Sequence, residues 1–224
     1  MGELLSILPG LLVFLGLMAV GAFFYRRHNQ NRDAQYASFA SRRQLTAIDL
    51  AAMQAHVGQF PFGQRGASTV VRSAHASADG VVLMHLHQVR AASPGERDHH
   101  SAAWLALDPS AQTPHLALRV RTLQVDNAIN RAIWGDPVEI SLDAWPGLAS
   151  YQCLGAPADR ATALLHGGLG DWMAGEAQAG RVRNLELRAD GLLLYQLERR
   201  PPAAERLEAL VAAGNVVRHL VTRR

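Results

Sequence analysis

An uncharged apolar segment near the start of the chain constrains the architecture more than any other feature. The segment from Leu4 to Phe24 contains 21 residues and no charged side chain. An α-helix rises about 1.5 Å per residue, so a helix of this length spans roughly 30 Å, which is the thickness of the hydrocarbon layer of a bilayer. We therefore predict a single transmembrane helix here, with the lipid bilayer as its partner.

Two other interpretations of this segment fit less well. A cleaved signal peptide has a basic start, a shorter apolar core and small residues at its cleavage site. Here Glu3 is the only charged residue before the segment, and the bulky side chains of Phe23 and Tyr25 stand at its end. A helix buried in a soluble core seldom runs this far with one polar residue, here Ser6. Both observations favour a membrane span.

Arginines follow the apolar segment and none precedes it. Arg26, Arg27 and Arg32 lie directly behind it in the chain. Positively charged flanks stay on the cytoplasmic side of a membrane. We expect a single-pass protein of the inner (plasma) membrane, with its N-terminus outside and its main domain in the cytoplasm. Anionic lipid headgroups are expected to attract the same arginines.

The composition restricts the remainder of the 224-residue chain. The formal net charge is +3 and both signs are mixed along the sequence, so no nucleic-acid partner is expected. All 22 basic residues are arginines, a bias typical of GC-rich genomes, and we assign them no phosphate-binding role. The single cysteine, Cys153, excludes a disulfide within the chain, and its apolar neighbours predict a buried side chain.

The pattern of the chain predicts three segments and an α+β fold. We expect a transmembrane anchor at 1–25, a basic juxtamembrane helical segment at 26–59 with Asp49 as a helix cap, and an α+β soluble domain at 60–224. In this fold class, one N-terminal transmembrane helix is followed by an antiparallel sheet with segregated helices. A turn with two aromatic residues, FPFGQRG, is expected where the soluble domain begins.

Asp-Gly turns between β-rich runs predict two hairpins in this domain. The first joins 68–77 to 81–89, and the second joins 182–187 to 192–197. Further strands are expected at 101–107, 115–120, 138–142 and 150–154, and the first four strands of the domain are expected to form a meander. Helices are expected at 157–174 and 203–221, and a short helix or an irregular segment at 124–134.

Histidines on one predicted strand are the main candidates for a ligand site. His85 and His87 are two residues apart, so both lie on the same face of the strand. His75 stands on the other arm of the same hairpin and completes a candidate metal-binding set. Zinc, however, needs three or four ligands and a firm set of supporting hydrogen bonds.

The alternative for this strand is a polar face in contact with water, opposite an apolar face. His99 and His100 offer two more imidazoles, but we expect them in a polar loop at 91–100. No catalytic signature supports an enzyme: the chain contains neither a G-x-S-x-G elbow nor a Walker A lysine, and no cofactor is expected. The glycine-rich HGGLGDW at 166–172 is expected to interrupt a helix.

These observations favour a membrane-anchored, non-enzymatic domain that binds a protein partner or supports an assembly at the cytoplasmic face. The alternative is a membrane-bound hydrolase or metal-dependent enzyme that uses the face lined by His75, His85 and His87.

Three apolar stretches carry a resemblance to a group of bacterial proteins. They are FPFGQRG, LDAWPGLASYQCLGAPADRATALL and LELRADGLLLYQL, and the second places Trp145, Tyr151 and Gly155 in an F/W-x(4–5)-Y-x-x-x-G pattern. The chain resembles single-pass membrane proteins from bacteria with GC-rich genomes, which pair an anchor with a small α+β domain. No activity is assigned to that group, so the resemblance implies an architecture and no site residues.

Overall fold

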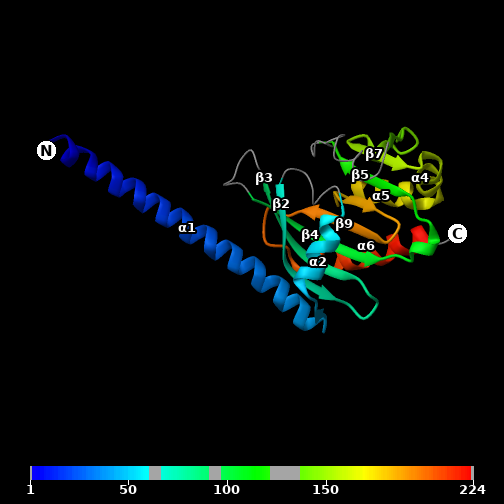
Figure 1. Cartoon of the computed structure of the whole chain (residues 1–224), viewed down its shortest axis with the longest axis horizontal. Coiled ribbons are helices and arrows are strands. Elements are labelled where there is room, and N and C mark those ends of the chain that lie inside the picture. Colours follow the sequence, from blue (N-terminus) through cyan, green and yellow to red (C-terminus); the bar gives the residue numbers. More distant parts are fainter. Residues whose placement is uncertain (1, 61–66, 91–96, 122–136, 223–224) are drawn as a thin grey trace.

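One long helix and one nine-stranded sheet dominate the structure, a computed structural model that describes residues 2–60, 67–90, 97–121 and 137–222 (Figure 1). Helix α1 (Gly2–Arg42) is 41 residues long and continues without a break from the expected anchor into the juxtamembrane segment. Apolar side chains along its first part are exposed, such as Leu11 at 50% and Phe24 at 63%. Among the described residues, it is the one helix long and apolar enough to cross a membrane.

The sheet is antiparallel throughout and open at both edges. Its strand order is β1-β2-β3-β4-β9-β8-β5-β7-β6. The strands are β1 (Thr46–Ala47), β2 (Ala67–Ala76), β3 (Val82–Arg90), β4 (Arg97–Ala106), β5 (His115–Val120), β6 (Val138–Glu139), β7 (Tyr151–Ala156), β8 (Asn184–Leu187) and β9 (Gly191–Leu197).

Helices cover both faces of this sheet. The helical elements after α1 are α2 (Leu50–Gly58), α4 (Ala158–Leu164), α5 (Gly170–Gln178), α6 (Ala204–Thr222), the 3₁₀ turns η2 (Pro109–Ala111) and η3 (Pro146–Leu148), and the π-helical turn η4 (Leu165–Leu169). Asp49 caps α2 as predicted, because its carboxylate accepts hydrogen bonds from the backbone N–H groups of Ala51 and Ala52. The α+β class predicted from the sequence is confirmed.

Both Asp-Gly hairpins are confirmed, but the predicted meander of four strands is wrong. Gly80 adopts a φ of 82°, the left-handed conformation that the β2–β3 turn requires and that glycine adopts without strain. Strand β5 does not pair with β4, because the β8–β9 hairpin lies between them. Sequence patterns report local turns well and carry no information on which distant hairpin inserts into a sheet.

Two buried clusters hold the layers together. The larger one packs α4, η4, α5, α6 and the end of α1 against one face of the sheet; its members include Phe39, Leu194 and Leu210. The smaller one packs α2 against the opposite face around Met84 and Trp104. We refer below to the face covered by α1 and α6 as the α1/α6 face. Burial of apolar area on both faces is the main stabilising contribution, at roughly 25 cal/mol per Å².

Several local predictions have a definite outcome. The helix expected at 157–174 is divided by the π turn η4, where Gly168 has a φ of 108°, so the glycine-rich stretch does interrupt a helix. Cys153 is buried as predicted. Most of FPFGQRG and the whole of 124–134 lie outside the described residues, and so does most of the expected loop before His99.

Candidate metal centre

The pairing of β3 with β4 brings three histidines together. His87 lies directly opposite His99, and His85 lies two residues further along the same face. Directly opposed residues of an antiparallel pair have Cβ atoms about 5 Å apart, which lets two imidazoles face one ion. One potential ligand atom from each of the three rings lies within 4.8 Å of the other two.

The rings are packed closely and point their nitrogens at one another. The Nε2 atom of His85 is 3.2 Å from the Nδ1 atom of His99. The His87 ring stands edge-on to both neighbours, with centroids 4.7 Å from His85 and 4.2 Å from His99. Three nitrogens this close together can supply three of the four ligands of a tetrahedral ion.

The cluster is buried, and burial keeps two of its imidazoles neutral. His85, His87 and His99 are 0%, 4% and 8% exposed. Burial, followed by the charges of the neighbouring His87 and His99, lowers the pKa of His85 to about 2. Burial and the positive charge of Arg32 lower the pKa of His99 to about 3. The neutral imidazole is the form that binds a metal, so these two rings need to lose no proton to become ligands at neutral pH.

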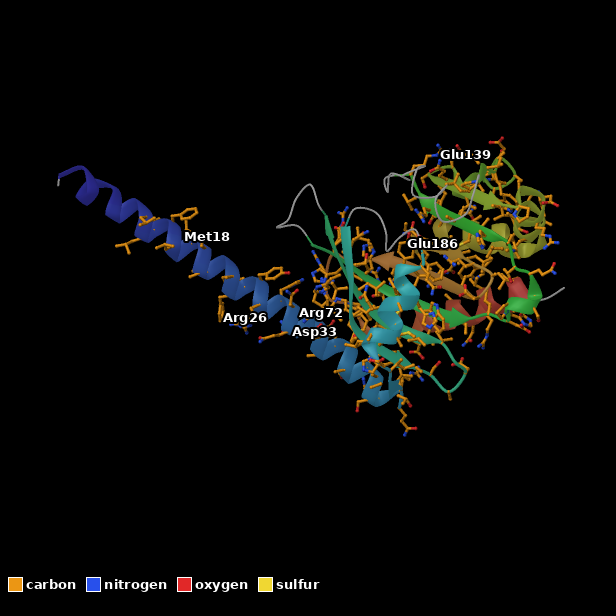
Figure 2. The ribbon with its side chains drawn as sticks, viewed as in Figure 1. Met18, Arg26, Asp33, Arg72, Glu139 and Glu186 are labelled. Carbon is orange, nitrogen blue, oxygen red and sulfur yellow. The ribbon has the colours of Figure 1, made fainter. Side chains whose placement is uncertain are left out.

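The part of α1 that follows the apolar segment forms one wall of this site. Oδ1 of Asp33 lies 3.2 Å from Nδ1 of His85, on the side of the ring away from His99. The Tyr36 ring stacks on His85 with a centroid distance of 4.8 Å and an interplanar angle of 10°. Figure 2 shows Asp33 and Arg72 where α1 meets the edge of the sheet. The wall is therefore made by side chains one helical turn apart on α1.

A chain of buried hydrogen bonds continues from Tyr36 into the sheet. Ser101 donates to Oε1 of Glu198 over 2.8 Å, because a carboxylate only accepts. The Tyr36 hydroxyl, 2.6 Å from Oγ of Ser101, is then the donor to that oxygen. Gln196 donates to the same Glu198 oxygen over 2.7 Å. These bonds satisfy polar groups that would otherwise destabilise a buried position.

Charges of both signs surround the cluster. Arg32 is 1% exposed and donates to the backbone carbonyl of Glu198 over 3.1 Å, while its second nitrogen lies 3.1 Å from Nε2 of His28. The carboxylates of Asp33 and Glu198 oppose this positive charge. The site is thus surrounded by charges of both signs and not by positive charge alone. Arg32 by itself lowers the affinity of the site for a cation.

The structure brings two of the three predicted histidines together and replaces the third. His75 lies on the same sheet face, but its cross-strand partner is Leu83, so it stands beside the apolar part of that face. His99 takes its place, because β4 begins at Arg97 and not at Ser101. His100 points to the opposite face, where its ring packs edge-on against Tyr195. The interpretation of this strand as a water-exposed polar face is wrong, since helix α1 covers it.

Cys153 and a surface cavity are two further places that could hold reactive groups, and neither offers a site comparable to the histidine cluster. Burial raises the pKa of the Cys153 thiol to about 12, which keeps it protonated and unreactive.

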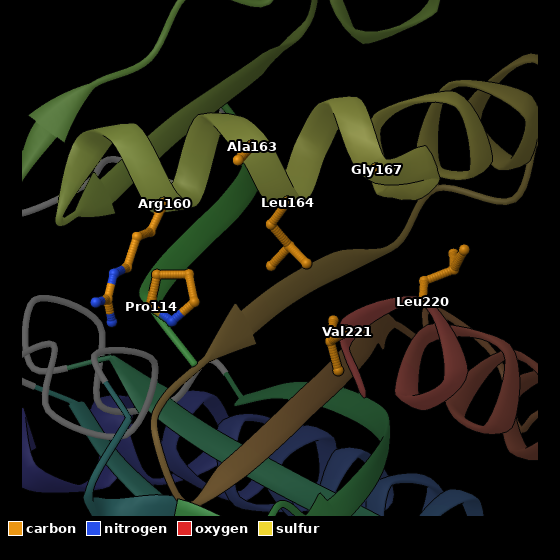
Figure 3. A pocket seen from close by; sticks show the side chains of 7 residues that line it. All are labelled: Pro114, Arg160, Ala163, Leu164, Gly167, Leu220 and Val221. Atoms are coloured by element: carbon orange, nitrogen blue, oxygen red, sulfur yellow. The ribbon is translucent and has the colours of Figure 1, made fainter. Parts of the chain in front are cut away.

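A cavity of about 280 Å³ lies between α4 and α6, with Arg160, Leu164 and Leu220 among its lining residues (Figure 3). Among the described residues that line it, Arg160 alone is charged, and that side chain already donates to Gln112. The described part of its lining therefore contains no set of convergent titratable groups.

Comparison with known proteins adds no assignment: no family model, no curated protein and no solved structure matches the chain. The chemistry of the site therefore rests on its own geometry. Imidazole nitrogens suit zinc, copper, nickel and iron, whereas magnesium and calcium prefer oxygen. A histidine ligand commonly donates its second ring N–H to a carboxylate, and Asp33 stands at that position for His85. The donor set fits a first-row transition metal.

Proposed function

We propose that this chain is a membrane-tethered domain that binds one transition-metal ion, of the zinc class, through His85, His87 and His99. The observation that carries the proposal is the convergence of three buried imidazoles within 4.8 Å, drawn from two strands. A bound cation would be held by one nitrogen from each of the three rings.

The proposal includes a location close to the membrane surface. Asp33 follows Phe24 by nine residues, which places it about 13 Å further along the helix axis. The exposed Arg26 and Arg27 lie between them, where anionic headgroups would attract them. With the positive flank in the cytoplasm, the metal site faces the cytoplasmic surface of the inner membrane.

Binding suits this site better than hydrolysis. A hydrolytic zinc site keeps one coordination position open to water and substrate. Here the three rings are at most 8% exposed, and Tyr36 stacks directly on His85. A metal at this position would stabilise the fold or make the protein respond to metal availability. The protein would then act by binding a protein partner through its docked domain.

Metal analysis of the purified chain tests the proposal. The full chain, carrying a tag without histidines, is extracted in mild detergent, loaded with Zn²⁺, desalted and analysed for metal and protein content. We expect one ion per chain for the native protein and less than a tenth of that for His99→Ala. The matched control is His75→Ala, which removes an imidazole from the same face and should keep one ion. Native protein without stoichiometric metal at saturating Zn²⁺ would contradict the proposal.

A further inference from the structure

The anchor helix contributes two side chains to the candidate metal centre. Asp33 contacts His85 at Nδ1, and Tyr36 covers the flat face of the same ring. Neither residue belongs to the sheet that supplies the three histidines. The site is therefore complete only while the juxtamembrane part of α1 lies against the α1/α6 face.

The two nitrogens of His85 have separate tasks in this arrangement. Nε2 faces His99 and the centre of the cluster, so it is the atom that would bind the metal. Nδ1 then carries the proton and donates it to Oδ1 of Asp33 over 3.2 Å. A carboxylate in this position fixes the orientation of the ring and makes the metal-binding nitrogen a stronger donor.

The strength of this contact depends on whether a metal is present. A cation on Nε2 withdraws electron density from the ring and makes the N–H at Nδ1 a better donor to Asp33. Asp33 is 43% exposed, and its carboxylate also lies 3.6 Å from Arg72 on β2, so the contact with His85 has a competitor. The Asp33–His85 contact links helix α1 to the sheet, and metal binding would strengthen this contact.

We infer that metal binding and the docking of the juxtamembrane part of α1 are coupled, with Asp33 as the positioning residue that transmits the effect. This inference rests on the proposed metal-binding function. Coupling is reciprocal, so a docked helix must raise metal affinity by the same factor by which metal favours docking. Metal occupancy would then set how rigidly the domain is held relative to the membrane.

Cysteine accessibility measures the docking directly. Ala40 on α1 is 4% exposed, and a cysteine there becomes reactive only when the helix leaves the sheet. The native Cys153 is buried and supplies the background rate. In the full chain in lipid nanodiscs, we expect Zn²⁺ to slow maleimide labelling of Ala40→Cys at least threefold relative to chelator. Labelling of Ala34→Cys, at an exposed position of the same helix, should not respond to Zn²⁺.

The variant Asp33→Asn separates the inference from the proposed function. It should lower Zn²⁺ affinity about 10- to 100-fold. At saturating Zn²⁺ it should also remove the protection of Ala40→Cys, and it should change the visible spectrum of bound Co²⁺ through the ligand His85. Asp159→Asn, an exposed change on α4, is the control and should alter none of these.

The outcomes are distinct. Native chain that binds no Zn²⁺ in the metal analysis contradicts the proposed function. Native chain that binds one Zn²⁺ but labels Ala40→Cys at a metal-independent rate contradicts the coupling alone. The same holds if Asp33→Asn keeps native affinity and native protection. Loss of both affinity and protection in Asp33→Asn, with Asp159→Asn unchanged, supports it.

Discussion

The α1/α6 face of the sheet has an apolar half and a polar half on the same three strands. The apolar half, under α6, consists of Leu83, Ala103, Leu105, Leu192 and Leu194. The polar half, under α1, consists of His85, His87, His99, Ser101, Gln196 and, directly after β9, Glu198. All of these side chains are buried, so exposure to water does not explain the change from one half to the other.

The two halves are stabilised in different ways. The apolar half gains free energy from the area removed from water, whatever its detailed arrangement. The polar half loses hydration of imidazoles and a carboxylate, and it recovers this only through specific hydrogen bonds such as those around Ser101. The buried polar region beside α1 is therefore stable only when its specific partners are in place.

The largest effect is expected from a change in the apolar half. Leu194→Ala removes a fully buried side chain from the main cluster and should lower the free energy of unfolding by about 2–5 kcal/mol. Urea unfolding of the full chain in detergent, followed by tryptophan fluorescence, measures this. The loss should be equal with and without Zn²⁺. Leu197→Ala, at a position 40% exposed, is the control and should cost much less. A loss that depends on Zn²⁺ would mean that the halves are not independent.

A change in the polar half should show the opposite behaviour. Zn²⁺ at 100 times its Kd should stabilise the native chain by about 2.7 kcal/mol. His99→Ala should abolish this increment, because two imidazoles remain where zinc needs three or four ligands. The measurement is the same urea titration with Zn²⁺ and with chelator. His75→Ala should keep the full increment. An increment that survives His99→Ala would place the zinc elsewhere on the chain.

The features that the sequence could predict are those that depend on neighbouring residues. The Asp-Gly turns at Gly80 and Gly191 depend on neighbouring residues only, and both hairpins were predicted correctly. The insertion of β8 and β9 between β4 and β5 depends on contacts between residues far apart in the chain. Periodicity within one segment carries no record of such contacts, so the order of strands could not be predicted.

The same distinction between local and long-range features applies to the candidate site, of which only His85 and His87 were predicted together correctly. His85 and His87 share a face because alternation along a strand is a local rule. The polar residues around His99 are typical of a loop, and only the pairing of β4 with β3 places it beside His85 and His87. Asp33 and Tyr36 could not be anticipated at all, because nothing in the helical pattern of α1 indicates which strand it covers.

Tyr36→Phe tests the hydrogen-bond chain of the polar half while keeping the ring on His85. It removes the donor to Oγ of Ser101, a buried bond of 2.6 Å, and should cost about 1–3 kcal/mol. The loss should be the same with and without Zn²⁺, since the stacked ring and the imidazoles remain. Tyr25→Phe, at an exposed residue, is the control for the same chemical change. A reduced zinc increment in Tyr36→Phe would show that the hydroxyl also orients the site.

The smallest effect is expected at the rim of the polar half, where Arg72 competes with His85 for Asp33. Arg72 Nη2 is 3.6 Å from Oδ2 of Asp33, and both side chains are almost half exposed. Such a pair contributes at most about 1 kcal/mol, so Arg72→Gln should raise Zn²⁺ affinity no more than about fivefold. The rise has two sources, since one positive charge leaves the vicinity of the ion and Asp33 is left to His85 alone.

Titration calorimetry of the full chain at low and at high salt measures this change. The gain from Arg72→Gln should shrink at high ionic strength, because exposed charges are screened over about 3 Å at 1 M salt. Arg121→Gln is the matched control: Arg121 is also exposed and lies 3.7 Å from a carboxylate, that of Glu139 near the far edge of the sheet, and its loss should leave the affinity unchanged. If Arg72→Gln lowers the Zn²⁺ affinity instead, Arg72 does not compete with His85 for Asp33. It then supports Asp33 in its contact with His85.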